Sequence, residues 1–152
     1  METHIQLIKE QDFNRVVELT NKAYSVPYKL GRQTTRANDT LDKIKGDIER
    51  GVIIFTAFVD DKIVGAVRCE QIDNFILLYK LVVDSVFRNK GIGGKLVKSV
   101  FQYSSDNNIN KVKIEVSEEK GLIPYYESFG FTISDRYFNK DHHEVSMIKN
   151  FH

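Results

Sequence analysis

Residues 75–101, FILLYKLVVDSVFRNKGIGGKLVKSVF, decide the fold. The opening run, 75–83, is apolar on both alternating faces, and Lys80 is its only charged residue. Runs of branched and aromatic residues like this one are typical of a central strand that is covered on both sides. From Ile92 onward the apolar residues follow the spacing of a helix. The stretch therefore predicts a buried strand, a glycine-rich loop and a helix in direct succession.

The glycine-rich junction has the composition of an anion site. The first turn of a helix carries backbone N–H groups that have no partner inside the helix. Glycines let a ligand approach that backbone closely, and the helix dipole favours negative charge there. Arg88, Lys90 and Lys95 add positive charge, and Asn89 is the only nearby side chain of a type that usually caps helices. The junction therefore predicts a phosphate-binding helix N-terminus.

Two common phosphate-binding patterns do not fit this junction. The P-loop pattern requires a glycine where Asn89 stands and a serine or threonine where Leu96 stands. The dinucleotide fingerprint requires a glycine at Leu96. The pattern that does fit is Arg-x-x-Gly-x-Gly, formed by Arg88, Gly91 and Gly93 and preceded by residues 81–84, LVVD. It resembles the acetyl-coenzyme A pyrophosphate loop of the GNAT-type acetyltransferases.

A second segment strengthens this resemblance. Residues 124–131, PYYESFGF, resemble the later motif of the same family, in which a short helix carries a tyrosine and ends at Gly-Phe. Gly130 also suits the left-handed position that closes a helix. The resemblance is strong from Leu81 to Phe131 and weak before Val52.

Length and composition indicate one ordinary globular domain over residues 1–152, with 41% hydrophobic and 28% charged residues. The net charge of +1 offers no general attraction for nucleic acid or a membrane surface. The single cysteine, Cys69, allows no internal disulfide. Because no signal peptide and no apolar run of membrane-spanning length are visible, we expect a cytoplasmic protein.

Periodicity and turn residues predict the order β-α-α-β-β-β-α-β-α-β-β. We expect Asp12 and Asp39 to cap the first two helices and Gly51 to end the second. The expected strands span residues 3–9, 52–59, 63–72, 75–83, 111–117, 131–138 and 144–149.

The family resemblance implies how these elements are arranged. It implies an α/β fold of the α+β kind, with a mixed, mostly antiparallel sheet of about seven strands flanked by four helices. Strands four and five would splay apart, and the pantetheine arm of the cofactor would lie between them. The arm would pair with the backbone of Leu81 and Val83 as another strand would.

The resemblance also implies the site residues. The cofactor would be bound by Leu81, Val83, Arg88, Asn89, Lys90, Gly91, Ile92, Gly93, Gly94 and Lys95. A backbone N–H near Val82 would stabilise the oxyanion. Tyr126 would protonate the leaving thiolate, since an unperturbed tyrosine has a pKa of about 10. The alternative role for Tyr126 is packing on its short helix.

The general base and the acceptor site are left open by the sequence. Glu115 and Glu70 could accept a proton directly, and Tyr79 and Ser117 could relay one through water. The acceptor site would involve the irregular segment 25–38 and nearby residues, with Tyr24, Tyr28, Arg32 and Tyr79 as candidates. If Arg32 and Arg36 point inward, they favour an acceptor with a carboxylate or phosphate; otherwise they are solvated loop residues.

No metal site is expected. His142 and His143 are adjacent, so their side chains would point to opposite faces of a strand, and no partner set with zinc spacing accompanies them.

Two departures from the family pattern remain: Ser85 stands where proline is common, and Glu118-Glu119 replace a frequent asparagine.

Two functions follow from the resemblance. The first is an N-acetyltransferase that moves an acetyl group from acetyl-coenzyme A to the amine of a small molecule or peptide by direct attack in a ternary complex. The alternative is a non-catalytic module that binds or senses acyl-coenzyme A. The acceptor, the acyl chain and pairing into a homodimer are left open by the sequence.

Overall fold

The computed structural model describes residues 2–24, 39–139 and 142–151 of the chain. Its strands are β1 Thr3–Leu7, β2 Ile53–Val59, β3 Lys62–Ile72, β4 Phe75–Val83, β5 Lys111–Ser117, β6 Thr132–Asn139 and β7 His142–Asn150. Its α-helices are α1 Phe13–Tyr24, α2 Leu41–Glu49, α3 Ile92–Asp106 and α4 Ile123–Glu127, and its 3-10 helices are η1 Glu10–Asp12, η2 Ser85–Phe87 and η3 Glu118–Lys120.

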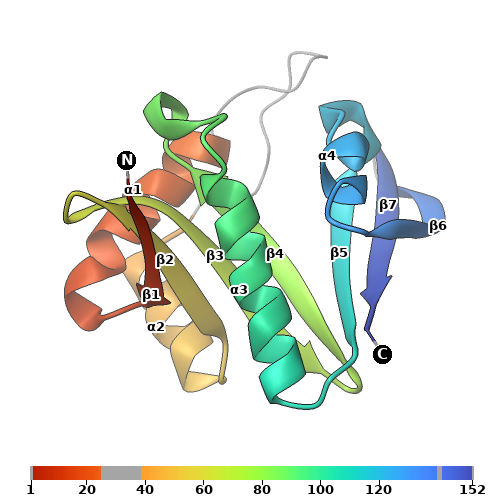
Figure 1. Ribbon diagram of the computed structural model, residues 1–152, viewed down its shortest axis with the longest axis horizontal. Coiled ribbons are helices and arrows are strands. Elements are labelled where there is room, and N and C mark those ends of the chain that lie inside the picture. Colours follow the sequence, from red (N-terminus) through yellow and green to blue (C-terminus); the bar gives the residue numbers. More distant parts are fainter. Residues whose placement is uncertain (1, 25–38, 140–141, 152) are drawn as a thin grey trace.

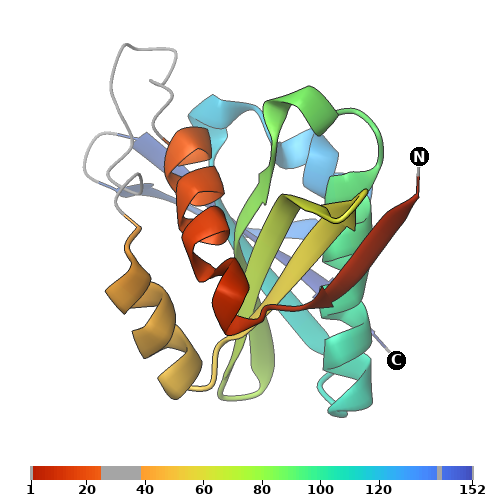
Figure 2. The ribbon, with the colours of Figure 1, turned by 90° about the vertical axis from the view of Figure 1, so that its left-hand side faces the viewer.

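The strands form one seven-stranded sheet in the order β1-β2-β3-β4-β5-β7-β6. Every neighbouring pair is antiparallel except β4 and β5, which run parallel. The predicted mixed, mostly antiparallel sheet and the predicted order of elements are therefore confirmed. Helices α1 and α2 cover one face of the sheet, and α3 covers the other (Figures 1 and 2).

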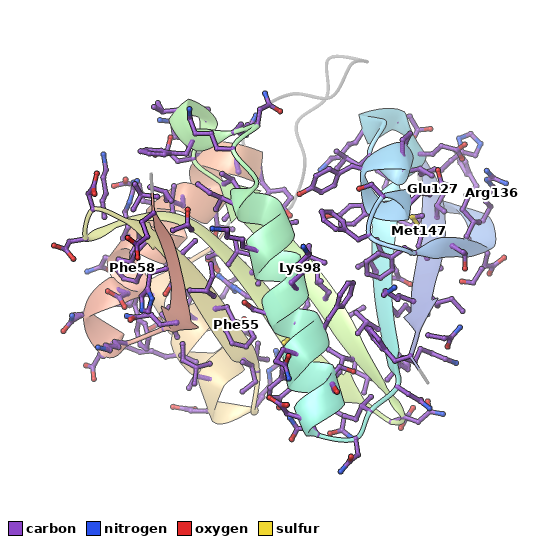
Figure 3. The ribbon with its side chains drawn as sticks, viewed as in Figure 1. Phe55, Phe58, Lys98, Glu127, Arg136 and Met147 are labelled. Atoms are coloured by element: carbon purple, nitrogen blue, oxygen red, sulfur yellow. The ribbon has the colours of Figure 1, made fainter. Side chains whose placement is uncertain are left out.

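Each face of the sheet has its own apolar core. The larger core packs α3 and α4 on the sheet; Met147 on β7 belongs to it, and Phe55 on β2 packs against it (Figure 3). The smaller core packs α1 and α2 through residues such as Val16 and Ile44. Strand β3 contributes to both cores, which explains why nearly all of its positions from Ile63 to Cys69 are buried.

The predicted splay of strands four and five is confirmed. Strands β4 and β5 are paired only at Ile76 with Val112 and at Leu77 with Lys113. Beyond these positions they separate toward the end of the sheet where α3 begins (Figure 1). The separation leaves the inner edge of each strand open.

A bulge in β4 lies inside this open region. Ala66 on β3 pairs with Val82 and Arg68 pairs with Tyr79, so the single residue Val67 faces two residues of β4. One of them, Lys80, has a left-handed backbone with φ of 50°. Such an extra residue bends a strand and increases its twist, so the bulge contributes to the divergence of β4 from β5.

The first two helix starts differ from the predictions. Asp12 belongs to η1, and its carboxylate accepts a hydrogen bond from the Lys9 N–H at 3.1 Å. The cap of α2 is Thr40, whose hydroxyl accepts from the Lys43 N–H at 3.1 Å. Asp39 was expected at that position, but its carboxylate is fully buried and pairs with Arg68.

Arg68 lies at the centre of an ion-pair chain that sequence periodicity did not reveal. Its side chain is 1% exposed, and it donates hydrogen bonds to Asp39 and, at 2.8 Å, to Asp47. Arg50 extends the series to the surface by pairing with Asp47 at 2.7 Å and with Glu70 at 3.5 Å. We refer to Glu70, Arg50, Asp47, Arg68 and Asp39 as the α2–β3 ion-pair chain.

We predict that Arg68→Met destabilises the protein by about 3–5 kcal/mol, because it leaves the buried Asp39 carboxylate without its counter-charge. The matched control is Arg50→Met, because the Arg50 side chain is 59% exposed. It should destabilise the protein much less, because solvent screens an exposed ion pair. Equilibrium unfolding in urea measures both, and equal losses would contradict a special role for the buried pair.

Candidate active site

A cleft of about 960 Å³ opens where β4 and β5 separate. It is lined by β4, the start of α3, β5, α4 and the last residues of α1. Most of the predicted site residues line it: Tyr24, Tyr79, Leu81, Val82, Val83, Arg88, Asn89, Gly91, Ile92, Gly93, Gly94, Lys95 and Tyr126. Lys90 is not among its lining residues, and Tyr28, Arg32 and Arg36 lie outside the described residues.

The start of α3 has the features expected of an anion site. Gly91 holds the N-cap position in a left-handed conformation with φ of 81°, which a side chain would disfavour. Among the described residues no side chain caps the helix; Asn89, the expected candidate, is itself left-handed with φ of 63°. The first intrahelical bond joins the Lys95 N–H to the Gly91 carbonyl at 3.2 Å. The first-turn amides that precede Lys95 therefore have no side-chain cap, and they lie beside the cleft.

Positive charge surrounds this helix start. Arg88 and Lys95 line the cleft, and so does Lys98, one turn further along α3 (Figure 3). The Arg88 Nε lies 3.5 Å from the Val83 carbonyl, which folds the side chain back along the end of β4. These cations complement the helix dipole in attracting an anion.

The turn that leads from β4 into this loop is held by Asp84. Its carboxylate accepts hydrogen bonds from the Val86 N–H and from Arg15 Nη2, both at 3.1 Å, and its own N–H donates to the Val64 carbonyl at 2.8 Å. The bond from Val86, with a contribution from Arg15, holds the pKa of Asp84 below its usual range. Asp84 thus fixes the turn at which Ser85 replaces the common proline.

Glycines at the start of α3 also allow α4 to pack closely. A Cβ atom at Gly93 would collide with the Tyr125 hydroxyl, and one at Gly94 would lie 3.2 Å from the Phe129 ring. The rings of Tyr125 and Phe129 pack edge to face, with centroids 5.0 Å apart. Gly93 and Gly94 therefore serve the contact between α3 and α4 in addition to the open backbone that the sequence predicted.

Tyr126 is both a packing residue and a wall of the cleft. It is 8% exposed, and its ring packs edge to face on Phe131 at 5.9 Å and on Tyr125 at 5.2 Å. Gly130, left-handed with φ of 96°, follows its helix as predicted. Burial raises the pKa of Tyr126, so the hydroxyl stays protonated at neutral pH and can donate a proton or a hydrogen bond.

The two candidate proton acceptors and the two candidate relays lie in different surroundings. Glu115, Ser117 and Tyr79 line the cleft, and Glu70 instead belongs to the α2–β3 ion-pair chain. Glu115 accepts a hydrogen bond from Tyr137 at 3.3 Å. Ser117 donates to Glu119 at 3.2 Å, and burial raises the pKa of Tyr79.

The charged residues Lys80, Lys98, Glu119 and Lys120 line the cleft but were not predicted as site residues, and the last two belong to η3. The Lys120 ammonium lies 5.0 Å from the ring centroid of Tyr24, so η3 and α1 meet at one end of the cleft. Glu119 accepts hydrogen bonds from the His143 backbone at 3.0 Å and pairs with its ring at 2.9 Å. His143 lowers the pKa of Glu119 to about 2. Only the tertiary structure shows this pair, because the two residues lie on separate elements.

No group of three or more His, Cys, Asp and Glu side chains suited to a metal ion occurs within the described ranges. Likewise, none of the helices in residues 2–24, 39–139 and 142–151 is long and apolar enough to cross a membrane.

We predict that Gly93→Ala destabilises the protein by about 1–3 kcal/mol, because the added methyl group collides with the Tyr125 hydroxyl. Adding Tyr125→Phe removes that hydroxyl, so the double variant should regain much of the loss. Thermal and urea unfolding of the four forms make a double-mutant cycle. Strictly additive effects of the two substitutions would show that the contact is unimportant.

We predict that His143→Gln raises the pKa of Glu119 toward that of an ordinary glutamate, because the ring that stabilises the carboxylate is lost. Carbon-detected NMR titration of the Glu119 carboxyl measures the change. His4→Gln, on the exposed β1, is the control and should leave Glu119 unaffected. An unchanged titration in His143→Gln would disprove the assignment.

Comparison with known proteins agrees with this geometry. The model of the acetyltransferase (GNAT) domain family matches residues 31–150. A [ribosomal protein bS18]-alanine N-acetyltransferase of Haemophilus ducreyi is 25% identical over 138 residues, which cover 88% of each chain. Human N-acetyltransferase 8 is 31% identical over 90 residues, but these cover 55% of this chain and 40% of that protein.

Among solved structures, the PaiA N-acetyltransferase of Thermoplasma acidophilum, in complex with coenzyme A, superimposes with a TM-score of 0.84. The two chains are 18% identical, and the match covers 99% of this chain and 100% of the other, so the likeness establishes the fold. With the family model covering most of the chain, the protein belongs to the GNAT acetyltransferase family.

Proposed function

We propose that the protein transfers an acetyl group from acetyl-coenzyme A to the primary amine of a small molecule or peptide, by direct attack within a ternary complex. The observation that carries this proposal is the shared cleft: the uncapped start of α3 and the Tyr126 wall open into the same space between β4 and β5. The cleft thus combines a helix start that suits a diphosphate with a wall that carries an acid-capable hydroxyl.

The residues present fit coenzyme A. The first-turn amides of α3, with Arg88 and Lys95, would hold the diphosphate. Because β4 has no strand partner beyond Leu77 on this side, its free backbone groups would bind the pantetheine arm. The cofactor supplies an activated acetyl thioester when bound.

The ladder with β3 indicates which backbone groups of β4 are free. Asp84 donates to Val64, and hydrogen-bonded pairs alternate along an antiparallel ladder. Val82, paired with Ala66, is therefore bonded to β3, and Val83 would direct its N–H group toward the cleft. The oxyanion donor would be a backbone N–H near Val82, next to the bulge of residues 80 and 81. Val83 would pair with the arm.

Tyr126 would hydrogen-bond the departing thiolate and give it a proton. Its raised pKa and its burial suit an acid that must stay protonated until the C–S bond breaks. The alternative function, a module that senses acyl-coenzyme A without chemistry, would need the α3 site but not this hydroxyl.

We predict that Tyr126→Phe lowers kcat about a hundredfold or more, because the proton donor is lost. The affinity for coenzyme A should stay within about twofold, because phenylalanine keeps the ring packing. Tyr103→Phe, on α3 and packed on Phe55, is the matched control. Release of coenzyme A and isothermal calorimetry give the two readouts.

The amine panel for this assay should begin with an alanine-initiated peptide, because the name of the Haemophilus relative specifies a ribosomal-protein alanine. Free amino acids, lysine-containing peptides and polyamines complete it. A protein that binds coenzyme A but turns over none of these amines, or one in which Tyr126→Phe works as well as the parent, would support the sensing module instead.

A further inference from the structure

Lys80 has the surroundings that a general base requires. Lys80 lies at the bulge of β4, directly before Leu81, and lines the cleft. Its side chain is 22% exposed, and its Nζ lies 3.8 Å from Asp39 Oδ1. A lysine that is mostly buried beside a reaction cleft is unusual, because its charged form loses hydration.

The Asp39 carboxylate beside Lys80 also has unusual surroundings. It is fully buried, and one oxygen accepts a hydrogen bond from Arg68. The other oxygen, Oδ1, has no hydrogen-bond partner in the part of the chain that the structure describes. An unsatisfied buried carboxylate oxygen is costly. The Lys80 Nζ lies 3.8 Å from this oxygen, so a proton arriving on Lys80 would give Oδ1 an ammonium to interact with.

The charge of the whole cluster supports the same interpretation. The α2–β3 ion-pair chain holds three carboxylates and two guanidinium groups, a net charge of −1. A protonated Lys80 brings the cluster to neutrality, and a neutral Lys80 leaves it one negative charge in excess. The cluster therefore draws a proton to Lys80.

Burial of Lys80 opposes this attraction. Burial lowers the pKa of Lys80, and the positive charges of Arg68 and Lys43 lower it further, whereas Asp39 and Asp47 raise it. The other ionisable groups that line the cleft from facing elements are Tyr24, Arg88, Lys95, Lys98, Glu115, Glu119, Lys120, Tyr125 and Tyr126. The balance brings the neutral and charged forms of Lys80 closer in free energy than in an exposed lysine.

Resting on the proposed acetyl transfer, we propose that Lys80 is the general base: its neutral amine takes a proton from the acceptor ammonium, and Asp39 holds the resulting lysine ammonium. The freed amine then attacks the thioester carbon, so a C–N bond forms and the C–S bond breaks. Tyr126 gives its proton to the leaving thiolate and regains one from the attacking nitrogen. Lys80 returns its proton to solvent.

The other candidates are engaged elsewhere. Glu70 pairs with Arg50 at 3.5 Å. Glu115 is 40% exposed, accepts from Tyr137 and has the Lys113 ammonium at 3.9 Å. Lys80 alone among these groups has a buried, unsatisfied carboxylate oxygen ready for its charged form.

The decisive comparison is between Lys80→Arg and Lys80→Met, assayed with the best amine of the panel between pH 6 and 10. Arginine keeps the positive charge but does not deprotonate in this pH range. It can therefore substitute for a lysine with a structural role but not for a lysine that acts as a base. Both variants should lower kcat about a hundredfold and lose the part of the pH profile that rises with pH, with unchanged calorimetric affinity for coenzyme A. A Lys80→Arg protein with parental kcat and pH profile would overturn the proposal.

A second measurement does not depend on any acceptor. Competitive labelling of the unmodified protein with isotopic acetic anhydride, read by mass spectrometry, reports the pH at which each lysine becomes nucleophilic. Lys80 should react at lower pH than the exposed Lys62. If Lys80 reacts only at the same pH as Lys62 or at a higher pH, Lys80 is not the base, even if amine turnover confirms the proposed function. Conversely, if Lys80 is labelled at a lower pH than Lys62 but the protein turns over no amine of the panel, the proposed acetyl transfer itself is rejected.

Discussion

The interaction on which the site depends is the short parallel pairing of β4 with β5. It ends after two positions, and from there each strand presents unpaired backbone groups to the cleft. Unpaired backbone groups inside a protein need other partners. A ligand with amide groups of its own, running between the strands, meets that need. The break in the sheet is therefore what makes the middle of this domain a binding site rather than a core.

A rigid frame on each side keeps this break open. Strand β4 pairs with β3 over seven positions, and β5 pairs with β7 over seven. The two halves are joined on one face by the packing of Tyr125 and Phe129 against Gly93 and Gly94. Each half thus keeps its own hydrogen-bonded support. The opening between β4 and β5 therefore leaves the pairing of the other strands intact.

Local sequence patterns were sufficient to predict the parts of the site that are local in the chain. The double-faced apolar run 75–83, the glycine junction at Gly91 and the helix end at Gly130 each depend on residues a few positions apart. Asp39 could not be assigned in the same way. Asp39 and Thr40 are both good caps, and only the position of Arg68, 29 residues away, decides that Asp39 is buried in an ion pair and Thr40 caps α2. The pair of Glu119 and His143 was hidden for the same reason.

The two faces of the sheet give the cleft two different electrostatic environments. On the α3 face, the helix dipole and nearby cations favour an anion, and the core beneath them is apolar. On the α2 face, alternating charges run from the surface at Arg50 and Glu70 to Asp39, beside Lys80. An acyl donor carrying a diphosphate is attracted from the first face, and a proton released in the cleft is attracted toward the second. Because the bulge of residues 80 and 81 lies beyond the last pair of β4 with β5, both environments meet at this part of β4. In the proposed acetyl transfer, the thioester and the lysine that accepts the amine proton would therefore lie side by side on β4.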